Sequence, residues 1–308
     1  QAVHAPTLFN GSFTGGRYGA RPLNGAEAQL ALAVINHGLT PDQMPWHVRL
    51  EVPEWAAAEL ERSLGEGAEA ELAAMLNQAP VDLRVNTLMI ERDAALAALA
   101  EEGILGRPTQ YSPFGIRVEG RPPLGAVQAF RQGLVEVQDE GSQVLAMLVD
   151  AHAGMHVLDL CAGAGGKSLA LAAMMENRGR ISACDIYEGK LERARERMRR
   201  ANVQNSRCRP ISGTSDPWLK RHKWDFDRVL VDAPCSGTGT WRRNPDARWG
   251  TKGTNLDEIT EIQTSLLHRG SSLVKPGGRV IYGTCSILMR ENDDVIAKFL
   301  EEHTDFEL

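Results

Sequence analysis

The sequence predicts a doubly wound α/β fold, in which a mostly parallel sheet is covered by helices on both faces. Three observations predict it: apolar strand-like runs alternate with helical runs after about residue 140, a glycine-rich turn follows the first of these strands, and unusual residues, two of them cysteines, stand where later strands end. Parallel sheets of this kind bind ligands at the carboxyl ends of their strands. We therefore expect a functional site there.

The expected elements of this α/β region follow from hydrophobic periodicity and turn residues. The expected strands are His156–Leu160, Arg180–Asp185, Arg228–Asp232 and Arg279–Thr284. The expected helices are Ser142–Val149, Lys167–Met175, Glu188–Ala201, Leu256–Val274 and Arg290–Glu302. Together they predict a catalytic region over residues 136–308.

Two further regions precede it. Residues 1–80 are rich in Ala and Glu, have helical spacing at Ala26–Val34 and Trp55–Leu64, and predict a helical N-terminal domain. Residues 81–135 predict a small α+β module. Its expected strands and helix are Asp82–Val85, Gly115–Val118, Leu134–Val137 and Arg92–Glu101.

Composition excludes several classes of protein. The 308 residues carry 34 Lys and Arg against 40 Asp and Glu, a net charge of −6, so the chain is no bulk polycation. The longest apolar runs, Ala94–Ala100 and Leu169–Met175, fall far below the roughly 18 residues that span a bilayer. The first residues, QAVHAPTLFNGSF, lack a basic stretch followed by an apolar one, so no secretory signal is expected within them. Five cysteines without CxxC spacing argue against a zinc ribbon or a disulfide framework, so we expect no metal and a reducing cytoplasm.

The glycine-rich turn, DLCAGAGGKS at Asp159–Ser168, allows three interpretations. A phosphate-binding P-loop lacks its first glycine, because Cys161 stands there. A dinucleotide fingerprint, GxGxxG, starting at Gly163 lacks its third glycine, because Ser168 stands there. The third is an S-adenosylmethionine loop, for which Asp185, at the end of the second expected strand, would accept hydrogen bonds from the ribose, although such a carboxylate also suits NAD. A tight turn without a ligand is the alternative.

Two cysteines follow two later strands. Cys235 lies in DAPCSGTG, at a place where amino-group methyltransferases carry Asp/Asn-Pro-Pro-aromatic, and Cys285 lies in YGTCS after the next strand. Because parallel strands end at one edge of a sheet, we expect both thiols in one cleft. The remaining cysteines, Cys161, Cys184 and Cys208, are expected to be small buried side chains.

A thiol suits methylation of carbon 5 of a pyrimidine, which is too weak a nucleophile to take a methyl group unaided. Addition of a thiolate to carbon 6 makes the ring enamine-like, so that carbon 5 attacks a sulfonium methyl; a base then removes the carbon 5 proton and the thiol is eliminated. Asp232 is placed to hold the cytosine edge at N3 and N4, and Lys167 to orient that carboxylate. The chemistry leaves open which of Cys235 and Cys285 attacks.

These motifs resemble the RNA cytosine-5 methyltransferases of the Sun or Fmu type, the RsmB/NOP family that includes the bacterial ribosomal RNA methyltransferase B. The matching stretches are LRVNTL at Leu83–Leu88, VQDEGSQ at Val137–Gln143, DLCAGAGGKS at Asp159–Ser168, DAPCSGTGTWRRNPDARW at Asp232–Trp249 and LVKPGGRVIYGTCSILMRENDDVI at Leu273–Ile296. The resemblance covers the chain from about Val81 to its end. It implies a class I methyltransferase with a Rossmann-like sheet.

By this resemblance, Cys285 is the nucleophile and Cys235 assists release of the methylated product. The implied cofactor contacts are Cys161, Ala162, Gly163, Ala164, Gly165, Gly166, Lys167, Asp185 and Asp232. The sequence departs from the family at Ala164, where proline is common, and at Ile211–Thr214, where the family carries an adenine-side Gly-Asp. It also stops at Leu308, before the strands that usually complete the sheet, so the catalytic region is expected to lack its last strands.

RNA contacts are expected from basic residues. Residues 186–223 carry eleven Lys or Arg against four acids, although part of this charge suits helical ion pairs. Arg242, Arg243 and Arg248 follow the Cys235 turn and are expected to hold phosphates beside the reacting base. The resemblance alone adds Arg84 and Asn86 and makes the 81–135 module an RNA-binding appendage. The base itself must be single-stranded or flipped out.

The sequence therefore predicts an S-adenosylmethionine-dependent RNA cytosine-5 methyltransferase, taken to be a monomer without metal or membrane partner. Ribosomal RNA is the expected substrate and transfer RNA the alternative. One rival is a catalytically silent RNA-binding or ribosome-assembly factor with the same fold, and a weaker one is a redox enzyme using a Cys235–Cys285 disulfide. A silent factor has no physical need for two thiols at adjacent strand ends beside Lys167 and Asp232.

Overall fold

The computed structural model describes residues 23–37, 44–250 and 255–308. The chain divides into two compact units, residues 1–53 and residues 54–308. The described helices of the first unit are α2 (Gly25–His37) and α3 (Trp46–Arg49). A capping box begins α2: the Glu27 amide donates to Asn24 Oδ1 (2.9 Å), and the Asn24 amide donates to the Glu27 carboxylate (2.8 Å).

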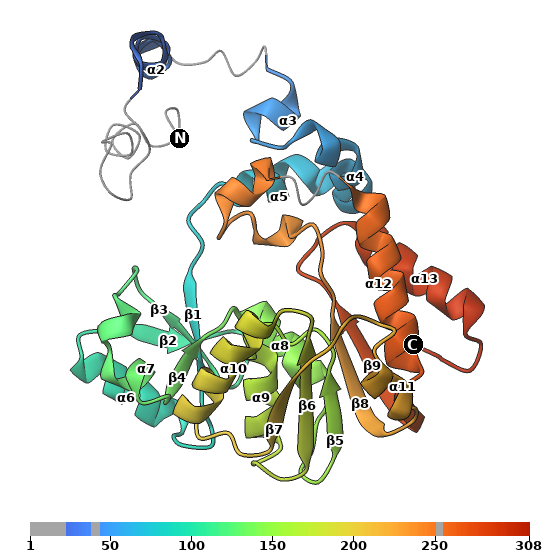
Figure 1. The fold of residues 1–308 in the computed structure, drawn as a ribbon. Coiled ribbons are helices and arrows are strands. Elements are labelled where there is room, and N and C mark those ends of the chain that lie inside the picture. The colour runs from blue at the N-terminus through green and yellow to red at the C-terminus, as the bar shows by residue number, and fades with distance from the viewer. Residues whose placement is uncertain (1–22, 38–43, 251–254) are drawn as a thin grey trace. The chain divides into compact units, whose positions relative to one another are not determined.

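The second unit begins with α4 (Glu54–Leu64) and α5 (Ala68–Ala74) and continues into a four-stranded antiparallel sheet. The strands of this smaller sheet, in the spatial order β2-β3-β1-β4, are β1 (Val81–Val85), β2 (Gly106–Pro108), β3 (Gly115–Val118) and β4 (Val135–Val137). Its helices are α6 (Arg92–Glu101) and α7 (Gln128–Arg131). Figure 1 shows them grouped with this sheet around a core that contains Leu83, Leu99 and Ile116. The strands and the helix expected for the α+β module are confirmed, whereas β2 and α7 were not predicted.

The rest of the second unit is built on a five-stranded sheet whose adjacent strands are all parallel. Its strands, in the spatial order β7-β6-β5-β8-β9, are β5 (His156–Asp159), β6 (Arg180–Asp185), β7 (Ser206–Pro210), β8 (Phe226–Asp232) and β9 (Val274–Gly283). Its helices are α8 (Glu140–Leu148), α9 (Gly166–Met174), α10 (Glu188–Arg200), α11 (Pro217–Arg221), α12 (Leu256–Ser271) and α13 (Asp293–Glu302). The predicted doubly wound α/β class is confirmed.

The core of the larger sheet explains why these segments form strands. The apolar residues of β5 and β8, such as Leu158 and Val229, are fully buried, because helices cover both faces of a parallel sheet. Figure 1 shows the five strands side by side with these helices around them. The edge strand β7 was not predicted, because its sequence SRCRP has no apolar run and most of it is exposed. None of the helices among the described residues is long and apolar enough to cross a membrane.

The strand order creates a crevice at one place in the larger sheet. From β5 the chain moves outward through β6 to β7, and it then returns to β8 on the other side of β5. Such a switch point is where open α/β sheets bind ligands. Asp159, Asp185 and Asp232 end β5, β6 and β8, and Cys285 follows shortly after β9. The predicted site residues Asp185, Asp232 and Cys285 therefore lie near one another at the carboxyl ends of the strands.

Candidate active site

The two thiols predicted to share a cleft lie against each other. Cys235 Sγ and Cys285 Sγ are 3.1 Å apart, within hydrogen-bonding distance, and both cysteines are free thiols. Cys235 lies in the loop after β8, and Cys285 lies in the loop after β9. Parallel pairing aligns Asp232 with Gly283, so both loops leave the sheet at the same level. The structure thus brings together two cysteines that are far apart in the sequence.

The environment of the pair makes the two thiols chemically different. The two thiols share a hydrogen bond in which either sulfur can be the donor. With Cys235 as the donor, this bond is the main reason why the pKa of Cys285 lies below that of an ordinary thiol. Burial and the charge of Asp232 oppose this shift, while the ammonium group of Lys167 supports it. The same hydrogen bond, together with burial, raises the pKa of Cys235. Cys285 is therefore the sulfur that ionises first, and the thiolate is the nucleophilic form.

Lys167 and Asp232 form an ion pair beside the thiols. Lys167 comes from the first turn of α9 and Asp232 ends β8, and Lys167 Nζ lies 2.6 Å from Asp232 Oδ2. The Lys167 side chain is 14% exposed and that of Asp232 is 32% exposed, so the carboxylate still reaches the solvent side of the crevice. The predicted orientation of Asp232 by Lys167 matches this contact.

The glycine-rich turn is held to the end of β6 through Asp185. The Gly163 amide donates to Asp185 Oδ2 and the Tyr187 amide donates to Asp185 Oδ1, both at 2.8 Å. Ala164 is held from the other side, because its carbonyl accepts a hydrogen bond from Arg197 Nη1 (2.8 Å). The turn and the Asp185 carboxylate therefore form one fixed unit at the crevice.

Beneath this turn lies a buried carboxyl group that sequence analysis did not single out. Asp159, the last residue of β5, accepts a hydrogen bond from Ser168 Oγ (2.6 Å) at the start of α9. Burial raises the pKa of Asp159 to about 7. Burial also raises the pKa of Cys161 above its ordinary range and that of Cys184 to about 12, so neither is a reactive thiol.

Comparisons with known proteins show to which family the chain belongs. The family model described as 16S rRNA methyltransferase RsmB/F matches residues 146–308, and the model described as the ferredoxin-like domain of RsmF/B-like methyltransferases matches residues 52–124. The chain belongs to the RsmB/F methyltransferase family. The resemblance stated from the motifs is therefore confirmed.

Individual relatives agree with this family. Ribosomal RNA small subunit methyltransferase B of Escherichia coli O6:K15:H31 is 33% identical over 83% of this chain and 59% of that protein. The probable enzyme of the same name from Bacillus subtilis is 34% identical over 83% of this chain and 57% of its own length. The crystal structure of a methyltransferase homolog protein from Pyrococcus horikoshii has a TM-score of 0.73 and 30% identity, covering 85% of this chain and 83% of that one. The chain thus spans less than three fifths of the curated relatives' length.

Membership of the RsmB/F family indicates S-adenosylmethionine as the cofactor, and the residues at the strand ends fit it. Among the described residues, nothing lies within 4 Å of the place where a Cβ on Gly163 would stand, so the loop backbone borders open space there. The φ angle of Gly163, +55°, favours glycine at this position. Each Asp185 oxygen accepts one amide hydrogen bond and retains a further lone pair for a ribose hydroxyl. Gly163 and Asp185 thus leave room and acceptors for the cofactor.

In this RsmB/F-family chain, the arginines after Cys235 contact protein backbone. Arg242 donates to the carbonyls of residues 77 and 78, and Arg243 Nη1 donates to the Pro80 carbonyl (2.8 Å). Arg243 also forms an ion pair with Asp139. Arg248 is 2% exposed and donates to the carbonyl of Met75, just after α5. The predicted phosphate contact is corrected for Arg248, because it is buried, whereas for Arg242 and Arg243 it stays a prediction.

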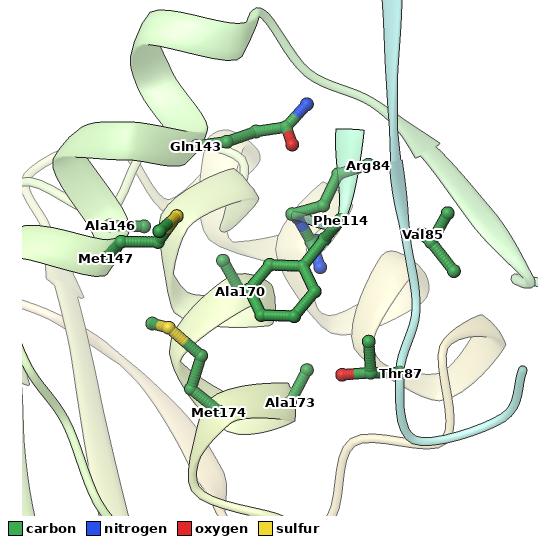
Figure 2. A pocket seen from close by; sticks show the side chains of 10 residues that line it. All are labelled: Arg84, Val85, Thr87, Phe114, Gln143, Ala146, Met147, Ala170, Ala173 and Met174. Carbon is green, nitrogen blue, oxygen red and sulfur yellow. The ribbon is translucent and has the colours of Figure 1, made fainter. Parts of the chain in front are cut away.

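Arg84 and Asn86, expected at the RNA on the resemblance alone, are buried at 3% exposure each. Arg84 Nε donates to Gln138 Oε1 (2.6 Å), and burial lowers the pKa of Arg84 to about 10. Figure 2 shows Arg84 beside a pocket of about 10 Å³, with Phe114 and residues of α8 and α9 around it. Asn86 Nδ2 donates to the carbonyls of Gly133 and Ala201, both at 2.9 Å. Asn86 thus joins the smaller sheet to the end of α10, while Arg84 bonds to the residue that follows β4. Because both side chains are buried, the prediction of RNA contacts is corrected here too.

Sequence analysis missed a buried polar group that connects the two cysteine loops. Glu291, in the short helix η7 (Met289–Glu291), is fully buried, and its carboxylate is bonded to the serines that follow Cys235 and Cys285. The available signal was position: Ser236, Ser286 and Glu291 all lie in the two motifs that carry the thiols. A glutamate at a helix start is otherwise typical of an exposed capping position, so the sequence did not reveal that it is buried.

Proposed function

We propose that this chain transfers a methyl group from S-adenosylmethionine to carbon 5 of a cytosine in ribosomal RNA, through a covalent bond between Cys285 Sγ and carbon 6. The observation that carries the proposal is the thiol pair, with its sulfurs 3.1 Å apart and its pKa values shifted in opposite directions. This arrangement favours ionisation of Cys285 while Cys235 beside it stays a thiol. Free thiols fit a reducing cytoplasm, where we expect the chain to act.

The first half of the reaction needs a nucleophile and an anchor for the base. The Cys285 thiolate adds to carbon 6, and the electron pair displaced from the C5–C6 double bond makes carbon 5 nucleophilic. In this proposal the Asp232 carboxylate accepts a hydrogen bond from the cytosine N4 amino group, and the ion pair with Lys167 supports that role. S-adenosylmethionine supplies an electrophilic methyl group when it is bound. Carbon 5 forms its bond to that methyl group as the bond from the methyl group to the sulfonium sulfur breaks, which leaves S-adenosylhomocysteine. Cys285 stays attached to carbon 6.

The second half reverses the covalent bond. The proton on carbon 5 passes to a base from the solvent, and the C–H electron pair re-forms the C5–C6 double bond. The sulfur departs from carbon 6 with the C–S electron pair, as the Cys285 thiolate. Cys235, whose raised pKa keeps it protonated next to Cys285, is placed to assist this release. The two sulfurs thus have consecutive roles, of which Cys285 takes the first.

The choice of ribosomal RNA rests on the relatives, whose names say that they are ribosomal RNA small subunit methyltransferases. The test is incubation of the full chain with methyl-labelled S-adenosylmethionine and total RNA from cells lacking the enzyme, followed by fractionation and mass spectrometry of nucleosides. We expect 5-methylcytosine in ribosomal RNA from wild type, and a loss of at least about 10³-fold in Cys285→Ala, as for removal of other covalent nucleophiles.

Cys208→Ala is the matched control, because Cys208 is a half-buried thiol of the edge strand β7 that packs against Met198. It should retain activity near that of wild type. A different methylated nucleoside, label only in transfer RNA, or full activity in Cys285→Ala would each contradict part of the proposal. The first would refute the chemistry, the second the substrate, and the third the nucleophile.

A further inference from the structure

A buried carboxylate lies behind the thiol pair and accepts hydrogen bonds from both cysteine loops. Glu291 Oε1 accepts from the Ser236 amide (2.8 Å) and from Gln263 Nε2 (3.0 Å). Glu291 Oε2 accepts from Ser236 Oγ (2.5 Å) and from Ser286 Oγ. Glu291 and Gln263 are both fully buried. All four of these contacts therefore form out of reach of solvent.

These contacts fix the backbone next to each sulfur. Ser236 directly follows Cys235, and Ser286 directly follows Cys285. Gln263, from α12, also donates to the carbonyl of Pro234, the residue before Cys235 (3.0 Å). The Cys235 loop is thus held on both sides of its cysteine, and the Cys285 loop is held at the next residue. One side chain couples the positions of two loops that follow different strands, β8 and β9.

The donor set explains why the residue is a glutamate. All four partners donate, and an ionised carboxylate offers about four acceptor sites and no donor. A glutamine of the same shape would replace one acceptor oxygen by an NH₂ group facing donors, and an unsatisfied buried polar group is costly. An aspartate would be one methylene too short to reach the same partners. We propose that Glu291 is a positioning residue that holds the two thiols at their reacting geometry.

The positioning role of Glu291 can be tested through the reactivity of the two thiols, because its negative charge affects their ionisation. The pKa of Cys235 is raised mainly by its hydrogen bond to Cys285 and by burial, and the negative charge of Glu291 adds to the shift. Removing that charge therefore eases ionisation of Cys235 relative to Cys285. A residue that merely supported the fold would leave the difference between the two thiols unchanged.

The inference rests on the proposed function for its catalytic consequence, but its test does not depend on methyl transfer. Initial rates of alkylation by iodoacetamide are measured between pH 6 and 9 at Cys235 and Cys285 separately, by peptide mass spectrometry, in the full chain. In wild type we expect Cys285 to react at lower pH than Cys235. In Glu291→Gln the Cys285-to-Cys235 rate ratio at pH 7 should fall at least about threefold, because the thiolate fraction governs the rate.

Methyl transfer is measured on the same proteins. Glu291→Gln should lower kcat at least about 10-fold, whereas the Kd for S-adenosylhomocysteine, measured by calorimetry, should stay within about twofold. Glu301→Gln, the same chemical change at an exposed position of α13, is the matched control and should leave both readouts unchanged. Unchanged thiol selectivity together with unchanged kcat in Glu291→Gln would overturn the inference.

If Glu291→Gln does not fold, Ser286→Ala serves in its place. It removes one donor to the carboxylate and leaves the acid itself intact. A smaller fall of the same alkylation ratio is then expected, and an unchanged ratio would overturn the inference. If wild type transfers no methyl group to any RNA, the proposed function fails, while the alkylation ratio still decides whether Glu291 sets the geometry of the thiols.

Discussion

At the scale of single residues, one glycine permits the close approach of the two cysteine loops. The Gly239 amide donates to the Cys285 carbonyl at 3.0 Å. A Cβ at position 239 would stand 2.7 Å from that carbonyl oxygen, closer than Cβ atoms come in real structures, and 3.1 Å from Ile287 Cγ2. The backbone carbonyl has no freedom to rotate away. The thiol pair therefore depends on the absence of a side chain at this position.

Gly239→Ala should push the Cys235 loop away from Cys285 and lower methyl transfer by about 10² or more, since displacements near 1 Å have this effect on reacting groups. The measurement is kcat for RNA methylation, with the Kd for S-adenosylhomocysteine as a check that the cofactor site persists. Gly189→Ala is the control, because, apart from its chain neighbours and the backbone of its own helix, no atom of the described residues lies within 4 Å of a Cβ there, and alanine favours this helix, α10. Wild-type kcat in Gly239→Ala would show that the loops tolerate separation.

Four residues of the site could be predicted from the sequence, and one buried residue could not. Cys235, Cys285, Lys167 and Asp232 were predicted because thiols and charges at strand ends suggest chemistry, and the structure places them together. Glu291 was not predicted, because its burial depends on packing of α12 and of both loops rather than on its own sequence neighbours.

At the scale of elements, hydrogen bonds connect the segment after α5 with the loop that follows Cys235. The arginine-rich loop donates hydrogen bonds to carbonyls at residues 75, 77, 78 and 80. Trp241, 1% exposed, packs edge-to-face against Trp55 of α4. Met289, in the same short helix as Glu291, donates its amide to Ser63 Oγ of α4 (2.9 Å). The helices of residues 54–74 thus contact both cysteine loops.

Arg243 takes part in this packing, so its removal should affect the stability of the fold. Arg243→Ala should lower the free energy of unfolding by about 1–2 kcal/mol, because it removes a charge-assisted bond to Asp139 and one to the Pro80 carbonyl. That corresponds to a fall in Tm of about 2–6 °C. If Arg243 also holds a phosphate, as its sequence position predicts, the slope of log RNA affinity against log salt should fall by about 0.7 as well. Calorimetric unfolding and filter binding at several salt concentrations measure the two effects.

The matched variant is Arg199→Glu, on the exposed face of α10. If this face contacts RNA, the slope of log affinity against log salt should fall by about 0.7 for each single-strand phosphate lost. The Tm should stay near that of wild type. A steep loss of salt dependence in Arg243→Ala without a fall in Tm would show that Arg243 binds phosphate and contradict its packing role.

Elements were predictable where burial is strong. The predicted strands His156–Leu160 and Arg228–Asp232 correspond to β5 and β8, whose residues read as near-continuous apolar runs because both faces are covered. The missed strands β2 and β7 both lie at sheet edges. An edge strand pairs on one side and is largely exposed, so a sequence such as GRP or SRCRP carries no hydrophobic signal.

At the scale of the whole second unit, the smaller sheet is joined to the glycine-rich turn by a buried charge. Glu136 of β4, 1% exposed, forms ion pairs with Arg197 and Arg200 of α10, and Arg197 also donates to the Ala164 carbonyl. The α+β module is therefore built into the catalytic part. This docking was not predictable, because its partners are distant in the sequence and each looks there like an ordinary exposed charge.

The covalent step is the central claim, and the most direct measurement is to trap it. Cys235→Ala is incubated with ribosomal RNA and S-adenosylmethionine, and the protein is digested and analysed by tandem mass spectrometry. If Cys235 assists release, an adduct should accumulate that joins Cys285 to a cytosine already methylated at carbon 5, and Cys235→Ala/Cys285→Ala should form none. An adduct on another residue, or free turnover in Cys235→Ala without any adduct, would contradict the roles given to the two sulfurs.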